Sequence, residues 1–228
     1  MLVGENLHYF TDRQDAGRQL TDKIFGLGTD NVTVIALSRG AILVAEEIAK
    51  KVHGSIFIFA TDEALGDKSG PGSAIFSGEA FSYNTAYPLG EIEEDESALR
   101  YLTDARHMSE YQKLNHIVGK DGLIPHALLN RHNIILVSDG LKNALSLQIA
   151  AEFLRRINVK KIILTTPVAS VEAIDKMHIL VDQIFCLSSL ENYTDTNHYY
   201  QKNEIPDDLT VVKIMQNIVL NWPIPEPN

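Results

Sequence analysis

The sequence predicts an α/β fold in which a mostly parallel β-sheet is flanked by helices. Several short runs of apolar and β-branched residues are continuous and do not alternate with polar ones. Such runs are typical of parallel strands that are buried on both faces of a sheet. Stretches whose apolar residues recur at helical spacing lie between these runs. This alternation of strand and helix favours a parallel sheet.

The N-terminal half is predicted to contain a helix, two buried strands and a loop-rich region. Apolar residues recur at helical spacing over residues 12–27, and Thr11 followed by Gln14 is a capping-box pattern for this helix. The elements predicted after it are strands over 32–37 and 55–60, a helix over 41–52, a Gly-rich loop over 62–73, a hairpin over 74–84 with Gly78 at its turn, and a helix over 95–117.

The C-terminal half is predicted to complete the sheet. Its predicted strands cover residues 133–137, 161–165 and 183–187, and its predicted helices cover residues 142–157, 171–177 and 206–222. A length of 228 residues suits one large domain, so we expect residues 1–222 to form a single domain. Residues 223–228 hold three of the eight prolines and are expected to form an extended tail.

Composition and charge exclude several classes of protein. Lysine and arginine number 20 and aspartate and glutamate 30, so the formal charge is −10. This disfavours a DNA-binding protein, because phosphate neutralisation needs clustered cations. The single cysteine, Cys186, excludes an internal disulfide and a cysteine-cluster metal site. Since no run approaches about 18 apolar residues and the N-terminus lacks a secretory pattern, we expect a cytoplasmic protein without a membrane span.

Residues 38–41 form a predicted turn between a buried strand and a helix. In this turn, backbone N–H groups at the helix start attract anions, and Arg39 adds a positive charge. The segment is therefore a candidate anion-binding turn. The simpler alternative is that Ser38 only caps the helix.

Ser38 also fits a third alternative, a serine hydrolase. Residues 36–40 match the nucleophile elbow G-x-S-x-G with Ala in the first place. Asp139 or Asp182, and then His198, follow in the chain order of such a triad. Only 37 residues precede Ser38, however, and they leave no room for the strands that come before the elbow in this class.

A second polar strand end follows the strand predicted over residues 133–137. Asp139 can accept hydrogen bonds from ribose hydroxyls, and the helix predicted from Lys142 can hold a phosphate at its N-terminus. The simpler alternative is that Asp139 only caps the turn. The candidate residues for a phosphorylated sugar are Asp139, Gly140, Lys142, Asn143, Ala144, Leu145 and Ser146.

Taken together, the two strand ends resemble type I phosphoribosyltransferases, and most closely a group of predicted bacterial phosphoribosyltransferases. The N-terminal Phe-x-Asp-Arg-x-x-Ala-Gly segment of that group matches residues 10–17. Its pyrophosphate loop, Leu-Pro-Arg-Gly-Gly, aligns with residues 37–41, and its ribose-phosphate motif aligns with residues 138–146. Residues 166–169 and the closing helix also fall in the expected order, so the resemblance extends over about residues 10–218.

The resemblance implies a phosphoribosyltransferase fold with a small hood, formed by the terminal segments and residues 74–90. It also implies a magnesium-dependent reaction of 5-phosphoribosyl 1-pyrophosphate (PRPP), with Asp139 as the catalytic residue that binds the ribose hydroxyls. Magnesium would enter with PRPP and would need no direct protein ligand. We further expect a homodimer, on base rates, and no nucleic-acid or membrane partner. The pyrophosphate would be bound by Ser38, Arg39, Gly40 and Ala41.

Three departures from the family pattern bear on activity. Ser138 stands in place of the first of two adjacent acids, and Thr61-Asp62 stands in place of Arg-Lys. The phosphate loop, typically Ala-Thr-Gly-x-Thr, reads Lys-Asn-Ala-Leu-Ser from Lys142 onwards. Lys68 in the Gly-rich loop could supply part of the lost charge, or could simply be solvated. We therefore expect weak or lost catalysis with retained binding of a phosphorylated ribose or nucleotide; the alternative is an active magnesium- and PRPP-dependent transferase.

Overall fold

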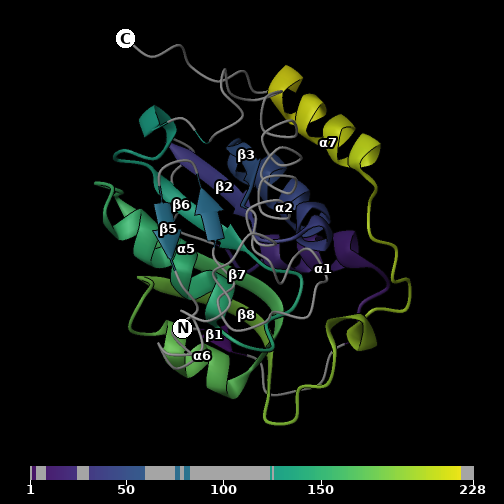
Figure 1. Cartoon of the computed structure of the whole chain (residues 1–228). Coiled ribbons are helices and arrows are strands. Elements are labelled where there is room, and N and C mark those ends of the chain that lie inside the picture. Colours follow the sequence, from purple (N-terminus) through teal and green to yellow (C-terminus); the bar gives the residue numbers. More distant parts are fainter. Residues whose placement is uncertain are drawn as a thin grey trace, which may run out of the picture.

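A six-stranded parallel sheet forms the centre of the computed structural model (Figure 1). The structure describes residues 2–3, 9–24, 31–59, 75–77, 80–82, 124 and 126–221. The strand order is β1-β8-β7-β6-β2-β3, and every neighbouring pair is parallel, which confirms the predicted fold class. The strand bounds are Leu2–Val3 (β1), Val32–Ala36 (β2), Ser55–Ile58 (β3), Asn133–Val137 (β6), Lys161–Ser170 (β7) and Gln183–Leu190 (β8).

Helices cover both faces of the sheet (Figure 1). Residues of α1, α2 and α7 share one buried apolar cluster with the sheet, whereas residues of α5 and α6 share the other. Val34 and Ile35, which are neighbours in β2, belong to opposite clusters, so both faces of this strand are buried. The helix bounds are Arg13–Thr21 (α1), Arg39–Val52 (α2), Leu145–Arg155 (α5), Val171–Met177 (α6) and Asp208–Asn221 (α7).

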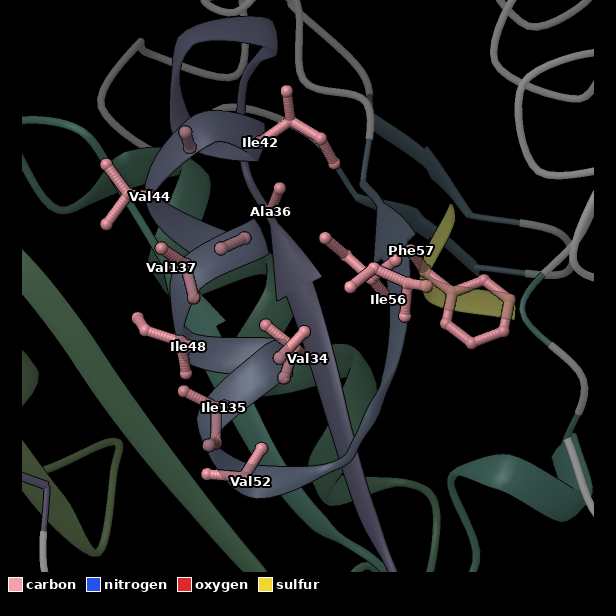
Figure 2. Close-up of a cluster of buried hydrophobic side chains, with 14 of the residues drawn as sticks. Val34, Ala36, Ile42, Val44, Ile48, Val52, Ile56, Phe57, Ile135 and Val137 are labelled. Atoms are coloured by element: carbon pink, nitrogen blue, oxygen red, sulfur yellow. The ribbon is translucent and has the colours of Figure 1, made fainter. Parts of the chain in front are cut away.

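The first cluster gives the neighbouring strands β2 and β6 a rigid base. Figure 2 shows Val34 and Ala36 of β2, Ile135 and Val137 of β6, and Ile48 of α2, all fully buried. Truncating a buried isoleucine such as Ile48 to alanine typically costs about 2–5 kcal/mol, because lost burial and a residual cavity both count. This packing fixes β2, β6 and the start of α2 relative to one another.

Most strands and helices lie where the sequence predicts them. β6 and α6 have the predicted bounds. β2 and β3 end slightly earlier than predicted, while β7 continues to Ser170 and β8 to Leu190. α7 begins at Asp208 instead of residue 206.

The predicted capping of the first helix is wrong by one residue. The side chain of Asp12 accepts the backbone N–H of Asp15 at 2.7 Å and caps α1. Thr11 instead donates its own backbone N–H to the carboxylate of Asp15. The helix ends at Thr21, where the backbone N–H of Asp22 bonds to the carbonyl of Leu20.

The predicted hairpin is confirmed as an antiparallel pair. It consists of β4 (Ile75–Ser77) and β5 (Ala80–Ser82), with Phe76 opposite Phe81. Outside the described residues lie Gly78, the predicted loop 62–73, the predicted helix 95–117 and the tail 223–228. The hood therefore stays a prediction. In the part of the chain that the structure describes, no helix is both long enough and apolar enough to cross a membrane.

Candidate functional site

The order of the sheet brings two polar strand ends together. From β2 the chain passes outward to β3, and the later strand β6 lies on the other side of β2. Ala36, at the end of β2, pairs with Val137, at the end of β6, so Ser38 and Asp139 emerge beside each other. Ligands of open α/β sheets bind at such a reversal of strand order, beyond the carboxyl ends of the strands.

Ser38 links the two strand ends. Its backbone is extended, and its Oγ accepts the backbone N–H of Ala41 at 2.8 Å, which caps α2. The same hydroxyl donates to Oδ1 of Asp139 at 2.8 Å. α2 therefore begins at Arg39, earlier than predicted, and its first N–H groups lie at this edge of the sheet. The capping interpretation of Ser38 is confirmed, while anion binding by the turn stays a prediction.

Asp139 is held by partners within the protein on both carboxylate oxygens. While Oδ1 accepts from Ser38, Oδ2 accepts from Nε of Arg13 at 2.7 Å. The side chains of Arg13 and Asp139 are only 1% and 11% exposed. The hydroxyl of Tyr200 donates to the backbone carbonyl of Asp139. The carboxylate expected to face a ribose is thus paired with a buried cation.

Arg13 is a site residue whose contacts the sequence did not reveal. One terminal guanidinium nitrogen, Nη2, donates to Oδ1 of Asn197 at 2.7 Å, and the guanidinium carbon lies 4.6 Å from the ring centre of Tyr200. The other terminal nitrogen, Nη1, is buried without a hydrogen-bond partner. The only signal in the sequence was the place of Arg13 in the N-terminal segment, residues 10–17, which says nothing about its partners.

Gly40 leaves the space in which this ion pair lies. A Cβ atom at Gly40 would collide with the Asp139 carboxylate and would come within 2.7 Å of Nε of Arg13. A side chain at residue 40 would therefore push against both members of the pair. Close approach of side chains, and not an unusual backbone angle, explains why glycine suits this position.

Two tyrosines flank the site on the side of residues 193–200, Tyr200 buried and Tyr193 half-buried. Burial, followed by the nearby charge of Asp139, raises the pKa of Tyr200 well above its ordinary value. Burial also raises the pKa of Tyr193, whose hydroxyl is hydrogen-bonded to Thr196 at 2.8 Å. A Cβ atom at Gly140 would collide with the Tyr193 hydroxyl. Both phenols therefore stay protonated around neutral pH and act as neutral hydrogen-bonding groups.

The segment after β6 does not form the helix start that the sequence predicts. Leu141 donates its N–H to Val168 of β7, and the chain turns only after this contact. The carbonyl of Lys142 accepts from the Ser170 hydroxyl at 2.8 Å. α5 begins at Leu145, and its N-cap residue makes no side-chain capping bond. The predicted start at Lys142 is wrong, because pairing with β7 keeps the chain extended.

The side chains of this turn are divided between surface and core. Those of Lys142 and Asn143 are exposed, whereas Ala144 is buried in the second apolar cluster. The side chains of Leu145 and Ser146 are outside the description. Lys142 therefore lies on the surface just before α5, and the backbone N–H groups at the start of α5 have no side-chain cap from residue 144.

The donor set at this site is poor for a divalent cation. Ser138 uses its hydroxyl within the turn, donating to the carbonyl and accepting the N–H of Gly140. Asp139 is paired with Arg13. Among the described residues, no three His, Cys, Asp or Glu side chains are grouped as metal ligands. Magnesium prefers unpaired carboxylates and water, so these residues do not fit it well. Thr61, Asp62 and Lys68 lie outside the description.

The described residues offer Ser38 no histidine that could act as the base of a serine hydrolase. Ser38 contacts Asp139 directly, whereas a triad needs a histidine between the serine and the acid. His198 instead has its Nε2 within 3.1 Å of the Tyr9 hydroxyl. Across the ranges that the structure describes, no hydrogen bond joins Ser38 to a histidine.

Sequence comparison identifies relatives along most of the chain. A family model of the phosphoribosyl transferase domain matches residues 5–201. Two curated Mycobacterium tuberculosis proteins, provisionally named phosphoribosyl transferases, are 23% identical to the chain over 191 residues. The match covers 79% of this chain and 40% of each relative, so the chain spans less than half their length.

Solved structures share the fold. TT1426 from Thermus thermophilus matches with a TM-score of 0.71 at 19% identity, over 94% of this chain and 99% of that one. AQ2163 from Aquifex aeolicus matches with a TM-score of 0.50 at 11% identity, over 81% of this chain and 77% of that one. At these identities the likeness concerns the fold alone.

Proposed function

Because the chain belongs to the phosphoribosyl transferase family, we propose that it binds a phosphorylated ribose or a nucleotide where β2 and β6 end, with weak or lost transferase activity. The proposal rests on two features of that edge. One is a turn and helix start that suit an anion. The other is an acid, Asp139, whose carboxylate is committed to partners within the protein.

The pairing of Asp139 with Arg13 is the observation that supports the proposal of reduced activity. A ribose diol, or water bound to magnesium, would have to share the carboxylate with a guanidinium 2.7 Å away. Drawing the acid away from Arg13 would leave a buried, uncompensated cation. Breaking a buried pair in this way costs about 3–5 kcal/mol of stability. This cost lowers the affinity of any ligand that binds through the carboxylate of Asp139.

Retained phosphate binding is supported by the backbone at the two helix starts. N–H groups in the first turn of α2, capped by Ser38, lie at the carboxyl edge of the sheet. The exposed Lys142 adds a full positive charge near α5. Helix N-termini and a nearby cation attract a phosphate together. A flexible lysine holds phosphate less tightly than a glycine-rich backbone cradle, so the affinity is modest and depends on salt.

An active magnesium- and PRPP-dependent transferase is the second candidate. The sheet order, which brings the two polar strand ends together, favours it. It requires Asp139 to serve the ribose despite its pairing. Release of pyrophosphate from PRPP in the presence of magnesium and a panel of purine and pyrimidine bases distinguishes the two candidates. The proposal expects no release above background, and steady turnover with any base would favour the second candidate.

Phosphate binding itself is tested with variants of two exposed lysines. Calorimetric titration with ribose 5-phosphate and a nucleoside monophosphate is run on the wild type, on Lys142→Ala and on the control Lys51→Ala at the far end of α2. We expect binding by the wild type and the control at low salt, weaker binding by Lys142→Ala, and loss at high salt. Absence of binding by the wild type would contradict the proposal. Equal binding by all three would remove Lys142 from it.

A further inference from the structure

A hollow of about 620 Å³ lies at the amino ends of the strands, at the other end of the sheet from the site formed by Ser38 and Asp139. It is lined by residues 155–162, which join α5 to β7, and by residues 179–182, which join α6 to β8. Both segments lead into the amino ends of parallel strands, whereas Ser38 and Asp139 follow carboxyl ends. The volume falls within the range of small-molecule sites, about 300–1,000 Å³. The hollow shares no residue with the site described above.

The lining is strongly basic in a chain that is acidic overall. Of the 20 lysines and arginines in the sequence, four line this hollow, against one acid, Asp182. Asp182 is already engaged, since its Oδ2 accepts the backbone N–H of Ile162 at 2.7 Å. The formal charge of the lining is thus 4 − 1 = +3, while that of the whole chain is −10. The four basic residues are Arg155, Arg156, Lys160 and Lys161.

Among the described residues, Arg155 is the one of these four cations whose side chain forms a hydrogen bond within the protein. Arg155 lies in the last turn of α5, where it complements the carbonyl end of the helix, and it donates to the carbonyl of Ile179 at 2.6 Å. Arg156, Lys160 and Lys161 are exposed, and within the described chain none of them forms an ion pair with a carboxylate. Three positive charges of the lining therefore have no carboxylate partner among the described residues.

We propose that this hollow is a binding site for a small anion that carries several phosphate groups. Arginine forks and lysine ammonium groups are the usual partners of phosphate oxygens, and several cations around one hollow suit a compact polyanion. Two isoleucines also line the hollow, Ile162, which is buried, and Ile179, which is 78% exposed. The phosphate chain of a nucleotide, with its base against Ile179, and a free oligophosphate both have this chemistry. An extended nucleic acid fits less well, since the chain as a whole repels it.

The probe for this site is tripolyphosphate, titrated by calorimetry at low and moderate salt. The test variant, Arg156→Glu/Lys160→Glu, reverses two charges of the hollow. The control, Lys51→Glu/Lys213→Glu, makes the same change in net charge on exposed residues of α2 and α7, which cover the other face of the sheet. We expect the wild type and the control to bind alike and the test variant to bind about tenfold more weakly or not at all.

Further arms separate this site from the strand ends and identify the source of the phosphate. Arg156→Gln/Lys160→Gln should repeat the loss if the reversed variant does not fold. Because the strand-end site is itself proposed to bind phosphate through Lys142, the two glutamine substitutions are also made in Lys142→Ala, where they should cause the same loss. If ATP binds more tightly than tripolyphosphate and Ile179→Ser removes that difference, the ligand is a nucleotide. If the two bind equally tightly, the ligand is a free oligophosphate. Three results would overturn the proposal. They are no binding of tripolyphosphate by the wild type, an equal loss of binding in the control, and a loss in Lys142→Ala without one in Arg156→Gln/Lys160→Gln.

Discussion

The guanidinium of Arg13 and the carboxylate of Asp139, 126 positions apart in the sequence, form a buried ion pair with Nε and Oδ2 2.7 Å apart. The pair ties the start of α1 to the end of β6, at the point where the strand order of the sheet reverses. The proposal of weak or lost catalysis rests on this pair, because the acid it occupies is the one expected to face a ribose.

Removing either member of the pair should destabilise the protein strongly. Arg13→Ala leaves a buried carboxylate and Asp139→Ala leaves a buried cation, so each should lower the free energy of unfolding by about 3–5 kcal/mol. The double variant should lose less free energy of unfolding than the sum of the losses in the two single variants. Urea denaturation measures all three. Arg18→Ala, whose side chain is 58% exposed beside Asp15, is the control and should change stability by less than about 0.5 kcal/mol. Additive losses would show that the pair is not coupled.

Gly40→Ala should destabilise through the same pair. The new Cβ would meet the Asp139 carboxylate and Nε of Arg13, and overpacking of this kind typically costs about 1–3 kcal/mol. The loss should be smaller when Asp139→Ala is already present, since the carboxylate is then gone. Melting temperatures of the four proteins in this cycle measure the effect. An undiminished loss in the Asp139→Ala background would locate the clash elsewhere.

The sequence predicts elements well where local pattern determines them. The run at 133–137 has four consecutive apolar residues after Asn133 and is bounded by polar residues, and β6 has these bounds. The same holds for α6, where Ser170 precedes an amphipathic stretch and caps it through the N–H of Ala173. Elements set by contacts with distant residues are predicted poorly. α5 begins late because Leu141 pairs with β7, and no pattern around residues 142–145 reveals that pairing.

The candidate site follows the same division. Ser38 and Asp139 are recognisable because each follows an apolar strand and precedes a helix. Their hydrogen bond depends on β2 and β6 being neighbours, which only the sheet order gives. Arg13, Asn197 and Tyr200 reach the site from both ends of the chain, so local pattern could not identify them as its members.

Alkaline pH should destabilise the protein partly through its single cysteine. Burial raises the pKa of Cys186 from its ordinary value of 9.0 to about 12, and the thiol donates to the carbonyl of Ser188. Because the native state holds this proton more tightly than the unfolded chain, the contribution to stability is complete below pH 9.0 and is lost as the pH rises towards about 12. Burial raises the pKa values of Tyr193 and Tyr200 as well, which acts in the same direction.

Urea denaturation between about pH 8 and pH 11 measures this loss. In Cys186→Ala the fall in stability should be shallower than in the wild type, although the lost packing lowers stability at every pH. A thiol reagent at about pH 8 should label the unfolded protein and leave the native protein unlabelled, since thiolate is the reactive form. Equal pH dependence in both proteins, or rapid labelling of the native state, would contradict the assigned role of Cys186.

Restoring the missing acid should create a dependence on magnesium. Ser138→Asp places a second carboxylate beside Asp139, at a position that is only 6% exposed. Without metal the variant should be less stable than the wild type, because a buried charge lacks a partner. Magnesium with PRPP should then raise its melting temperature more than that of the wild type. Ser138→Asn, which adds similar volume without charge, is the control. Equal responses of the two variants would make the phosphate loop, and not the lost acid, the limiting feature.

The effect of magnesium on PRPP binding by the wild-type protein tests the central claim most directly. PRPP is titrated by calorimetry with and without magnesium. Melting temperatures are recorded at a PRPP concentration of 100 times the dissociation constant, where a bound ligand adds about 2.7 kcal/mol to the free energy of unfolding. Because Arg13 already occupies Asp139, we predict modest PRPP binding that changes less than about twofold when magnesium is added. Binding that becomes tenfold or more tighter with magnesium would show that the ligand uses Asp139, and would contradict the account.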